Sequence, residues 1–280
     1  MNALLKRTIT GLIYAVLFIG SICSVHLMKE GAPALNYFFA AFLLVVLIGC
    51  TYEFYKMISV QGASPIKWMG YIFSAGVLVL CVLSCSLFTA AILLAAVICV
   101  FFPMLLVVQL WRKSEQPIRD VAYTIVPVFY LSIPLCMMFL TQQLVPDGWL
   151  YLLLMVAMVW ANDVFAYLGG SLYGKHRMWE RVSPKKTWEG TITGILCSVI
   201  VTSVLGWWLL PMDSMIVWPA VGLVGAVLAT LGDLAESMIK RSVGVKDSGN
   251  VMPGHGGFLD RFDSLLAVAP FYFIVIFLVV

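Results

Sequence analysis

Carboxylate side chains interrupt the most apolar segments in the second half of the chain. Asp163 lies inside one apolar run. Asp233 lies towards the end of another, where Glu236, Ser237 and Lys240 follow it. Spacings of three, four and seven residues put these side chains on one face of a helix. A charge at the centre of a membrane helix costs about 2.5–3.5 kcal/mol, so such a residue usually faces a wet cavity and has a function.

Two further carboxylates, Asp260 and Asp263, stand at the start of the last apolar run with Arg261 between them. Magnesium binds hard oxygen ligands, typically one or two carboxylates together with substrate phosphates. We therefore predict that Asp233 and Asp260 hold a magnesium ion, with the Ser237 hydroxyl as a further contact.

The alternative is that these carboxylates only neutralise neighbouring cations. Asp233 would then pair with Lys240, and Asp260 would pair with Arg261. The residues alone leave this alternative open.

A basic segment before one apolar run has the composition of a phosphate-binding loop. It ends with Ser183-Pro-Lys-Lys-Thr187, so two hydroxyls and the ammonium groups of Lys185 and Lys186 precede the expected start of a helix. Helix N-termini favour anions through free N–H groups and the macrodipole. The alternative is that these lysines only follow the tendency of cationic residues to stay on the cytoplasmic side. That tendency explains their charge, but not this sequence directly before a helix.

A second polar segment, residues 240–263, is rich in glycine. His255, Gly256 and Gly257 lie within it, and Lys246 precedes them. Glycine lets the backbone approach a ligand closely, so main-chain N–H groups and lysines can surround a phosphate. The segment is not a Walker A loop, because the GxxxxGK[ST] pattern does not occur. A lone histidine is more often a structural hydrogen bonder, but the surrounding glycines and aspartates make His255 a candidate site residue.

The elements that must position these residues are membrane helices. Of 280 residues, 62% are apolar and 11% are charged, and the mean hydropathy is +1.01. Soluble domains have about 25% charged residues, so a soluble globular protein is excluded. We expect an all-α polytopic integral membrane protein, since a spanning helix needs about 20 mostly apolar residues. Nine such runs occur, at residues 8–27, 34–52, 68–82, 88–111, 121–141, 150–172, 190–210, 215–236 and 264–280.

The distribution of cationic residues predicts the orientation of these helices. If the N-terminus is cytoplasmic, the alternate connections on that side carry 16 of the 17 lysines and arginines, and only Lys29 lies outside. This distribution predicts an N-in, C-out topology. The chain also changes character near residue 150. We predict that residues 1–149 form five scaffold helices and that residues 150–280 form four catalytic helices with two charged cytoplasmic loops.

The polar residues of the second half resemble a known family motif. The segments Ser237-Met-Ile-Lys-Arg241, Lys246-Asp-Ser-Gly249 and His255-Gly-Gly-Phe-Leu-Asp-Arg-Phe-Asp263 together resemble the signature of the phosphatidate cytidylyltransferase (CDP-diacylglycerol synthase) family. The basic segment that ends at Thr187 and the aspartate of Asn162-Asp163 also resemble family features. The resemblance is dense over residues 160–264, whereas before that it is a matter of hydropathy.

The resemblance implies transfer of the cytidylyl group of CTP to phosphatidic acid, giving CDP-diacylglycerol and pyrophosphate. It also implies Mg²⁺ held by Asp233 and Asp260, with Ser237 close by and room for a second cation. Bringing two anions together requires cations and positioning more than a strong base. The expected substrate- and phosphate-binding residues are Asp163, Ser183, Lys185, Lys186, Thr187, Ser237, Arg241, Lys246, Gly256, Gly257 and Arg261. The expected catalytic residues are Asp233, Lys240, His255, Asp260 and Asp263.

The expected partners are CTP, phosphatidic acid and the lipid bilayer, without nucleic acid, and a homodimer is left open. The expected location is the bacterial cytoplasmic (inner) membrane, with the active site facing the cytoplasm. A secondary transporter is disfavoured because no inverted repeat occurs, and a CDP-alcohol phosphotransferase because its DGxxAR…GxxxDxxxD pattern is absent. A lipid kinase that uses CTP is excluded less firmly. A purely structural membrane protein would leave the glycine-rich segment unexplained.

Overall fold

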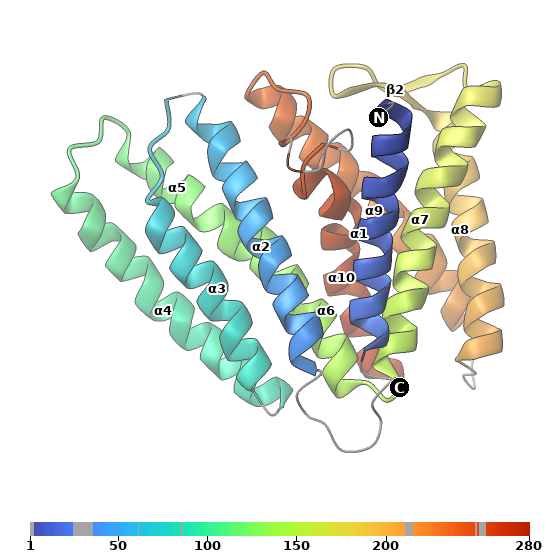
Figure 1. The fold of residues 1–280 in the computed structure, drawn as a ribbon, viewed down its shortest axis with the longest axis horizontal. Coiled ribbons are helices and arrows are strands. Elements are labelled where there is room, and N and C mark those ends of the chain that lie inside the picture. Colours follow the sequence, from blue (N-terminus) through green and yellow to red (C-terminus); the bar gives the residue numbers. More distant parts are fainter. Residues whose placement is uncertain are drawn as a thin grey trace. The chain divides into compact units, whose positions relative to one another are not determined.

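The computed structural model describes residues 3–24, 36–60, 62–84, 86–210, 215–249, 251 and 256–280, without the side chains of residues 3–7 and 36. This part of the chain is almost entirely helical (Figure 1), in agreement with the expected all-α class. Its elements in chain order are α1 (Ala3–Cys23), α2 (Asn36–Ser59), α3 (Lys67–Leu83), α4 (Leu87–Trp111), α5 (Pro117–Pro127), the π-helix η3 (Val128–Ser132), α6 (Ile133–Leu144), α7 (Gly148–Tyr173), β1 (Arg177–Trp179), β2 (Ser183–Thr187), α8 (Trp188–Leu209), α9 (Val217–Ser242) and α10 (Leu259–Val279).

Seven helices within the described residues are long and apolar enough to cross a membrane. They are Tyr37–Ser59, Leu87–Trp111, Pro117–Leu144, Gly148–Tyr173, Trp188–Leu209, Val217–Ser242 and Leu259–Val279. Two further apolar helices, Thr8–Cys23 and Lys67–Leu83, are shorter. The integral membrane architecture is thus supported, whereas the count of nine crossings and their orientation stay predictions.

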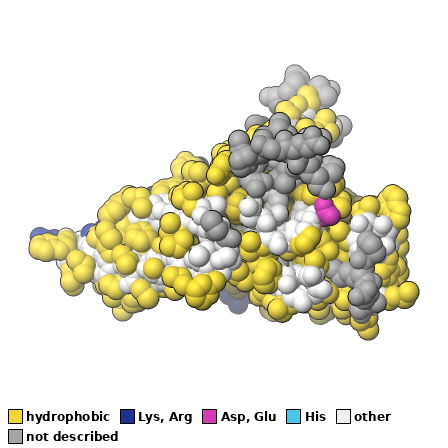
Figure 2. Space-filling model, turned by 90° about the horizontal axis from the view of Figure 1, so that it is seen from below, with side chains coloured by type: hydrophobic (Ala, Val, Ile, Leu, Met, Phe, Trp, Pro, Cys, Tyr) yellow, Lys and Arg dark blue, Asp and Glu magenta, His cyan; other side chains and the backbone are white. Residues whose placement is uncertain are grey.

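Apolar side chains are exposed along several of these helices. Phe88, Leu110 and Leu172 are 74%, 83% and 78% exposed. On the face drawn in Figure 2, hydrophobic side chains cover most of the described surface, and Lys and Arg are seen only at its edges. Exposed apolar area of this extent is unusual in soluble monomers and suits contact with lipid.

The chain separates into two compact units. Unit 1 comprises Met1–Leu144 and Asp247–Asp260, and unit 2 comprises Val145–Lys246 and Arg261–Val280. Most of the glycine-rich segment therefore belongs to the unit that contains the N-terminal helices, although it follows residue 150 in sequence. We predict that residues 1–149 form a scaffold and that residues 150–280 carry out catalysis. These roles concern activity and stay a prediction.

Polar contacts fix the packing of α2, α3 and α5 in unit 1. The Tyr55 hydroxyl on α2 donates to the carbonyl oxygen of Thr124 on α5 (3.1 Å). The Thr124 hydroxyl in turn accepts a bond from the N–H of Ile66, directly before α3 (2.8 Å). Gly70 on α3 leaves the space that the Tyr55 hydroxyl occupies. Within apolar surroundings each such bond satisfies a group that would otherwise be costly to bury.

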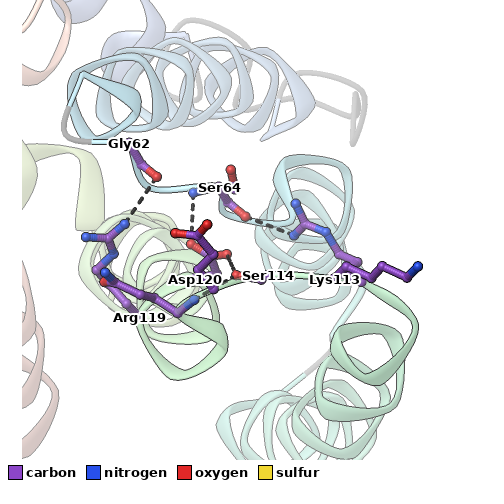
Figure 3. Close-up of a pocket in the computed structure, with 9 residues that line it drawn as sticks. Gly62, Ser64, Lys113, Ser114, Arg119 and Asp120 are labelled. Carbon is purple, nitrogen blue, oxygen red and sulfur yellow. Dashed lines mark hydrogen bonds between the residues drawn. The ribbon is translucent and has the colours of Figure 1, made fainter.

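A cavity of about 410 Å³ lies between the α2–α3 and α4–α5 connections of unit 1 (Figure 3). Buried Asp120 accepts a bond from the N–H of Ser64 (2.8 Å). Arg112 donates to the carbonyl oxygen of Ser64 (2.9 Å), and Arg119 donates to that of Gly62 (3.1 Å). These bonds tie the two connections together, so the charged residues here have a clear structural role.

Small residues bring α7 and α8 close together in unit 2. A Cβ atom at Gly190 of α8 would lie 2.6 Å from the carbonyl oxygen of Ala166 and 2.9 Å from backbone atoms of Gly170, both on α7. Membrane helices commonly use such residues where their backbones approach closely. The Ser198 hydroxyl on α8 also donates to the carbonyl oxygen of Met158 on α7 (2.9 Å).

The basic segment before α8 forms a two-stranded antiparallel hairpin, a structure that the sequence did not predict. Arg177 of β1 lies opposite Thr187 of β2, and Trp179 lies opposite Ser183. The Thr187 side chain then caps α8 by accepting a bond from the N–H of Gly190 (3.2 Å). Such a cap stabilises a helix start by about 1 kcal/mol. The predicted helix start is therefore correct, but a hairpin precedes it.

Candidate active site

A cavity of about 440 Å³ in unit 2 contains several of the predicted site residues. Residues of α7, β2 and α9 line it together with Arg177 of β1 and Thr191 of α8. The lining residues are Asn162, Asp163, Ala166, Tyr167, Gly170, Ser171, Arg177, Lys185, Lys186, Thr187, Thr191, Thr230 and Asp233. Segments far apart in sequence thus place cationic, anionic and hydroxyl groups around one space large enough for a small ligand.

Lys186 and Asp233 form an ion pair at this cavity. The Lys186 ammonium lies 2.7 Å from the Asp233 carboxylate, and it also donates to the carbonyl oxygen of Thr230 (3.4 Å). The two charged side chains are 23% and 34% exposed, so solvent reaches both of them. A partly solvated pair contributes little net stability. The ammonium can therefore turn to a phosphate at a small energetic cost.

Buried hydrogen bonds hold the walls of this cavity in place. Asn162 on α7 donates to the Thr230 hydroxyl on α9 (3.3 Å), and both side chains are buried. Thr187, which is 3% exposed, fixes the end of β2 against the start of α8 through its cap. The side chains that face the cavity consequently project from helices and a hairpin that are tied to one another.

Three carboxylates gather near this cavity, on α9 and α10. Asp233, Glu236 and Asp263 each offer an oxygen atom that lies within 4.8 Å of the others. Glu236 is fully buried and pairs with Lys240 one turn further along α9. Three like charges at this separation repel one another, and a divalent cation would offset that repulsion. Their hard oxygen atoms are the ligands that Mg²⁺ prefers, so the donor set fits this ion.

The predicted metal ligands belong to different units. Asp233 belongs to the carboxylate cluster, and the Ser237 hydroxyl donates to it (3.3 Å). Asp260 belongs to unit 1, where its carboxylate accepts bonds from the N–H groups of Ser248 (3.1 Å) and Gly257 (2.8 Å). The Asp260 carboxylate therefore shapes the glycine-rich segment, and the sharing of one ion with Asp233 stays a prediction.

The helices around the motif extend further than the hydropathy indicated. α9 continues to Ser242, so Lys240 and Arg241 lie on the helix and not in a loop. The Arg241 guanidinium donates to the carbonyl oxygen of Val182 in the hairpin turn (3.2 Å). α10 already begins at Leu259. α9 extends beyond its apolar run because charged residues paired along one helix face can remain helical outside the membrane core.

The other predicted phosphate-binding residues that the structure describes do not line the unit 2 cavity. Lys246 and Arg261 are exposed, and Ser183 lies in β2. Gly256 adopts a positive φ of 81°, where a Cβ atom would lie 2.5 Å from the Asp260 carboxylate. Gly257 is buried in the same segment, and His255 lies outside the described residues.

Three polar residues that the sequence interpretation left without a role lie at or near these features. Arg177 lines the unit 2 cavity, Glu236 completes the carboxylate cluster, and Glu53 on α2 contacts the glycine-rich segment in unit 1. Glu236 shares a helix face with Asp233 because it lies three residues further on. Glu53 gave a weaker signal, since it directly follows the second apolar run and its partners lie about 200 residues away.

Comparisons with known proteins agree with the resemblance found in the sequence. A sequence model described as "Cytidylyltransferase family" matches residues 5–279. A protein named phosphatidate cytidylyltransferase from Staphylococcus haemolyticus (strain JCSC1435) is 34% identical over 274 residues, which cover 94% of this chain and 95% of that protein. Proteins of the same name from Staphylococcus aureus (strain COL) and Staphylococcus epidermidis (strain ATCC 12228) are 41% and 40% identical over 161 and 158 residues, which cover 56% of this chain and 60% of each relative.

We expect Gly190→Ala to destabilise unit 2, because the added methyl group would overlap backbone atoms of α7. Overpacking of this kind costs about 1–3 kcal/mol. Thermal unfolding of the purified protein in detergent measures the effect. Gly76→Ala on α3 is the matched control, since no atom of the described residues lies within 4 Å of the added Cβ there. Equal melting temperatures for the two variants would contradict the close α7–α8 packing.

Proposed function

The chain belongs to the cytidylyltransferase family, and from this premise we propose that it transfers the cytidylyl group of CTP to phosphatidic acid, forming CDP-diacylglycerol and pyrophosphate. The names of its relatives support this choice of substrates. The observation that carries the proposal is the unit 2 cavity, where Arg177, Lys185 and Lys186 lie with two carboxylates. Cations beside carboxylates are the groups that a metal-dependent reaction of phosphates needs.

The proposed reaction is a substitution at the α-phosphorus of CTP. A phosphate oxygen of phosphatidic acid attacks this phosphorus and forms a new P–O bond. The bond from the α-phosphorus to the bridging oxygen breaks, and pyrophosphate leaves with the electron pair. The attacking phosphate is ionised at neutral pH, so no strong base is required. The residues must instead offset repulsion between the substrates and the charge that develops on pyrophosphate.

The cationic residues of the cavity have distinct proposed roles. Lys185 is exposed and free to follow the triphosphate, whereas Lys186 is held between β2 and α9 by its contacts to Asp233 and Thr230. We assign Lys186 to a fixed phosphate position for this reason. Asp163 lines the same cavity and would orient the lysines or contribute to a second cation site.

We propose that Asp233, Glu236 and Asp263 hold the magnesium ion that the family resemblance implies. When bound, the ion would offset charge on the CTP phosphates and on the departing pyrophosphate. Lys240 would hold the Glu236 carboxylate in position through its ion pair. Asp260 is the alternative ligand beside Asp233, as the sequence motif implies. A second cation remains part of this proposal.

We also propose nine crossings with the N-terminus in the cytoplasm and the C-terminus outside. The two shorter apolar helices would add to the seven long ones, since a helix of about 17 residues is just long enough to span. The 16-to-1 distribution of lysine and arginine supports this orientation. The site would then face the cytoplasm of a bacterial inner membrane, where CTP is available. Nucleic acid has no part in this proposal, and a homodimer stays open.

Purified protein supplied with CTP, Mg²⁺ and phosphatidic acid should release pyrophosphate and form CDP-diacylglycerol. We expect Asp233→Asn and Asp260→Asn to lower turnover by a factor of about 100 or more, because charge stabilisation in the transition state is lost. Glu115→Gln, which alters an exposed carboxylate of unit 1, is the control and should stay active. Formation of CDP and a phosphorylated lipid would instead support a CTP-dependent lipid kinase.

Binding of Mn²⁺, followed by electron paramagnetic resonance, separates the two proposed ligand sets without an activity assay. We expect Glu236→Gln and Asp263→Asn each to weaken Mn²⁺ binding about tenfold or more, because each removes a carboxylate ligand. Mn²⁺ binding by Asp260→Asn is measured for comparison, because Asp260 belongs to the alternative ligand pair. Unchanged binding in Glu236→Gln and Asp263→Asn, together with loss in Asp260→Asn, would favour the pair Asp233 and Asp260. Thermal unfolding shows whether each variant is still folded.

Thiol labelling in intact cells tests the proposed orientation. Cysteines introduced at Lys113 and Glu180 should be protected from a membrane-impermeant maleimide until the membrane is opened, whereas one at Pro146 should react at once. All three positions are exposed, so burial does not interfere. The unmodified protein gives the background from its own cysteines. The reverse labelling pattern would disprove the N-in orientation.

A further inference from the structure

A buried carboxylate on α2 is bonded to the glycine-rich segment within unit 1. Glu53 is 1% exposed. It accepts hydrogen bonds from the hydroxyl of Ser248 (2.9 Å) and from the N–H groups of Phe258 and Leu259 (both 3.0 Å). An N-terminal helix is thereby connected to both sides of the segment that carries the family motif.

The donors around Glu53 satisfy a charge that would otherwise be costly to bury. A buried carboxylate is tolerated only when hydrogen bonds or cations replace its water shell. Leu259 is the first residue of α10, so its N–H group has no partner within the helix and forms part of the positive end of the helix dipole. The bonds at Glu53 therefore use amide groups that need an acceptor.

Glycines in this region leave room for the Glu53 carboxylate. A Cβ atom at Gly249 would lie 2.5 Å from a Glu53 oxygen, and one at Gly257 would overlap both this carboxylate and the Ser248 hydroxyl. On α2, a Cβ atom at Gly49 would lie 2.6 Å from the ring of Phe258. The backbone of the segment approaches Glu53 as closely as it does because these three positions lack side chains.

A second carboxylate, Asp260, also binds residues of this segment. Asp260 accepts bonds from the N–H groups of Ser248 and Gly257 (3.1 and 2.8 Å). Ser248 is thus bonded through its hydroxyl to Glu53 and through its N–H group to Asp260. The two carboxylates together fix the start and the end of the segment around Gly249 and Gly257.

We propose that Glu53 is a positioning residue for cytidylyl transfer, which holds Ser248, Phe258 and Leu259 in the arrangement that the motif needs to use CTP. This inference rests on the proposed function. Glu53 itself touches no reacting atom, since its oxygens are taken up by donors of the protein. Its carboxylate acts through the Ser248 hydroxyl and the backbone of Phe258 and Leu259.

The variant that tests this proposal is Glu53→Gln in the full-length protein. Glutamine keeps the size of the side chain, but its NH₂ group would face a donor that cannot turn into an acceptor. We expect amide hydrogen exchange in a peptide covering residues 256–262 to accelerate about tenfold or more, since hydrogen bonds to a charged group are lost. Glu115→Gln makes the same chemical change at an exposed site and should exchange as the unmodified protein does.

Kinetics separate positioning from a purely structural role. For Glu53→Gln we expect kcat/KM for CTP to fall by a factor of about 10–100, while KM for phosphatidic acid changes by less than about twofold. Ser248→Ala removes one of the donors and keeps the carboxylate, so it should show a smaller effect in the same direction. The effects of the two substitutions should be less than additive when they are combined, because they remove a shared contact.

Normal exchange in Glu53→Gln, or faster exchange with an unchanged kcat/KM for CTP, would overturn the positioning role. Should Glu53→Gln fail to fold, the same two measurements on Ser248→Ala decide the question. Failure of the proposed function is seen separately, as a lack of CDP-diacylglycerol formation by the unmodified protein. In that case faster exchange alone would show a structural contact and would contradict a role in cytidylyl transfer.

Discussion

Each charge that this chain buries among apolar helices must find its partners within the protein. Water is scarce there, and an unsatisfied charge costs several kcal/mol, typically more than a single helix contact provides. The structure meets this constraint in different ways. Glu53 and Asp120 are bonded to backbone N–H groups of connecting segments, whereas Glu236 is paired with a lysine of its own helix. These hydrogen bonds and ion pairs hold particular connecting segments against particular helices, so the buried polar residues help to fix how the apolar helices pack.

The same constraint explains why the candidate site lies where connections meet helix ends. Close packing of α7 and α8 at Gly170 and Gly190 leaves little space between their backbones. The space appears instead beside the hairpin, where Lys186 extends from β2 to Asp233 on α9. The close packing of α7 against α8 and the position of Lys186 beside Asp233 are thus features of the same unit. The cavity at this position is lined by cationic, anionic and hydroxyl side chains.

Much of this architecture was predictable from the sequence, because hydropathy directly reports the apolar runs. The expected runs correspond to the observed helices, apart from bounds such as the end of α9 at Ser242, where charged residues continue the helix beyond the apolar run. Charge and residue type also singled out Asp233, Lys185 and Lys186 as candidate site residues, and the structure places all three at one cavity. The hairpin was missed because its strands are too short for a periodic pattern. Glu53 was missed because its role depends on contacts with Ser248, Phe258 and Leu259, and the local sequence around residue 53 does not indicate partners so far along the chain.

The bond between Glu53 and Ser248 joins residues 195 positions apart, and this separation affects how the protein is made. Glu53 emerges from the ribosome early in synthesis, whereas Ser248, Phe258 and Leu259 emerge only when most of the chain has been made. During that interval α2 must reside in or near the bilayer with a charged group awaiting its partners. The hydrogen bonds of Glu53 to the start of α10 can therefore form only after residues 258 and 259 have been synthesised.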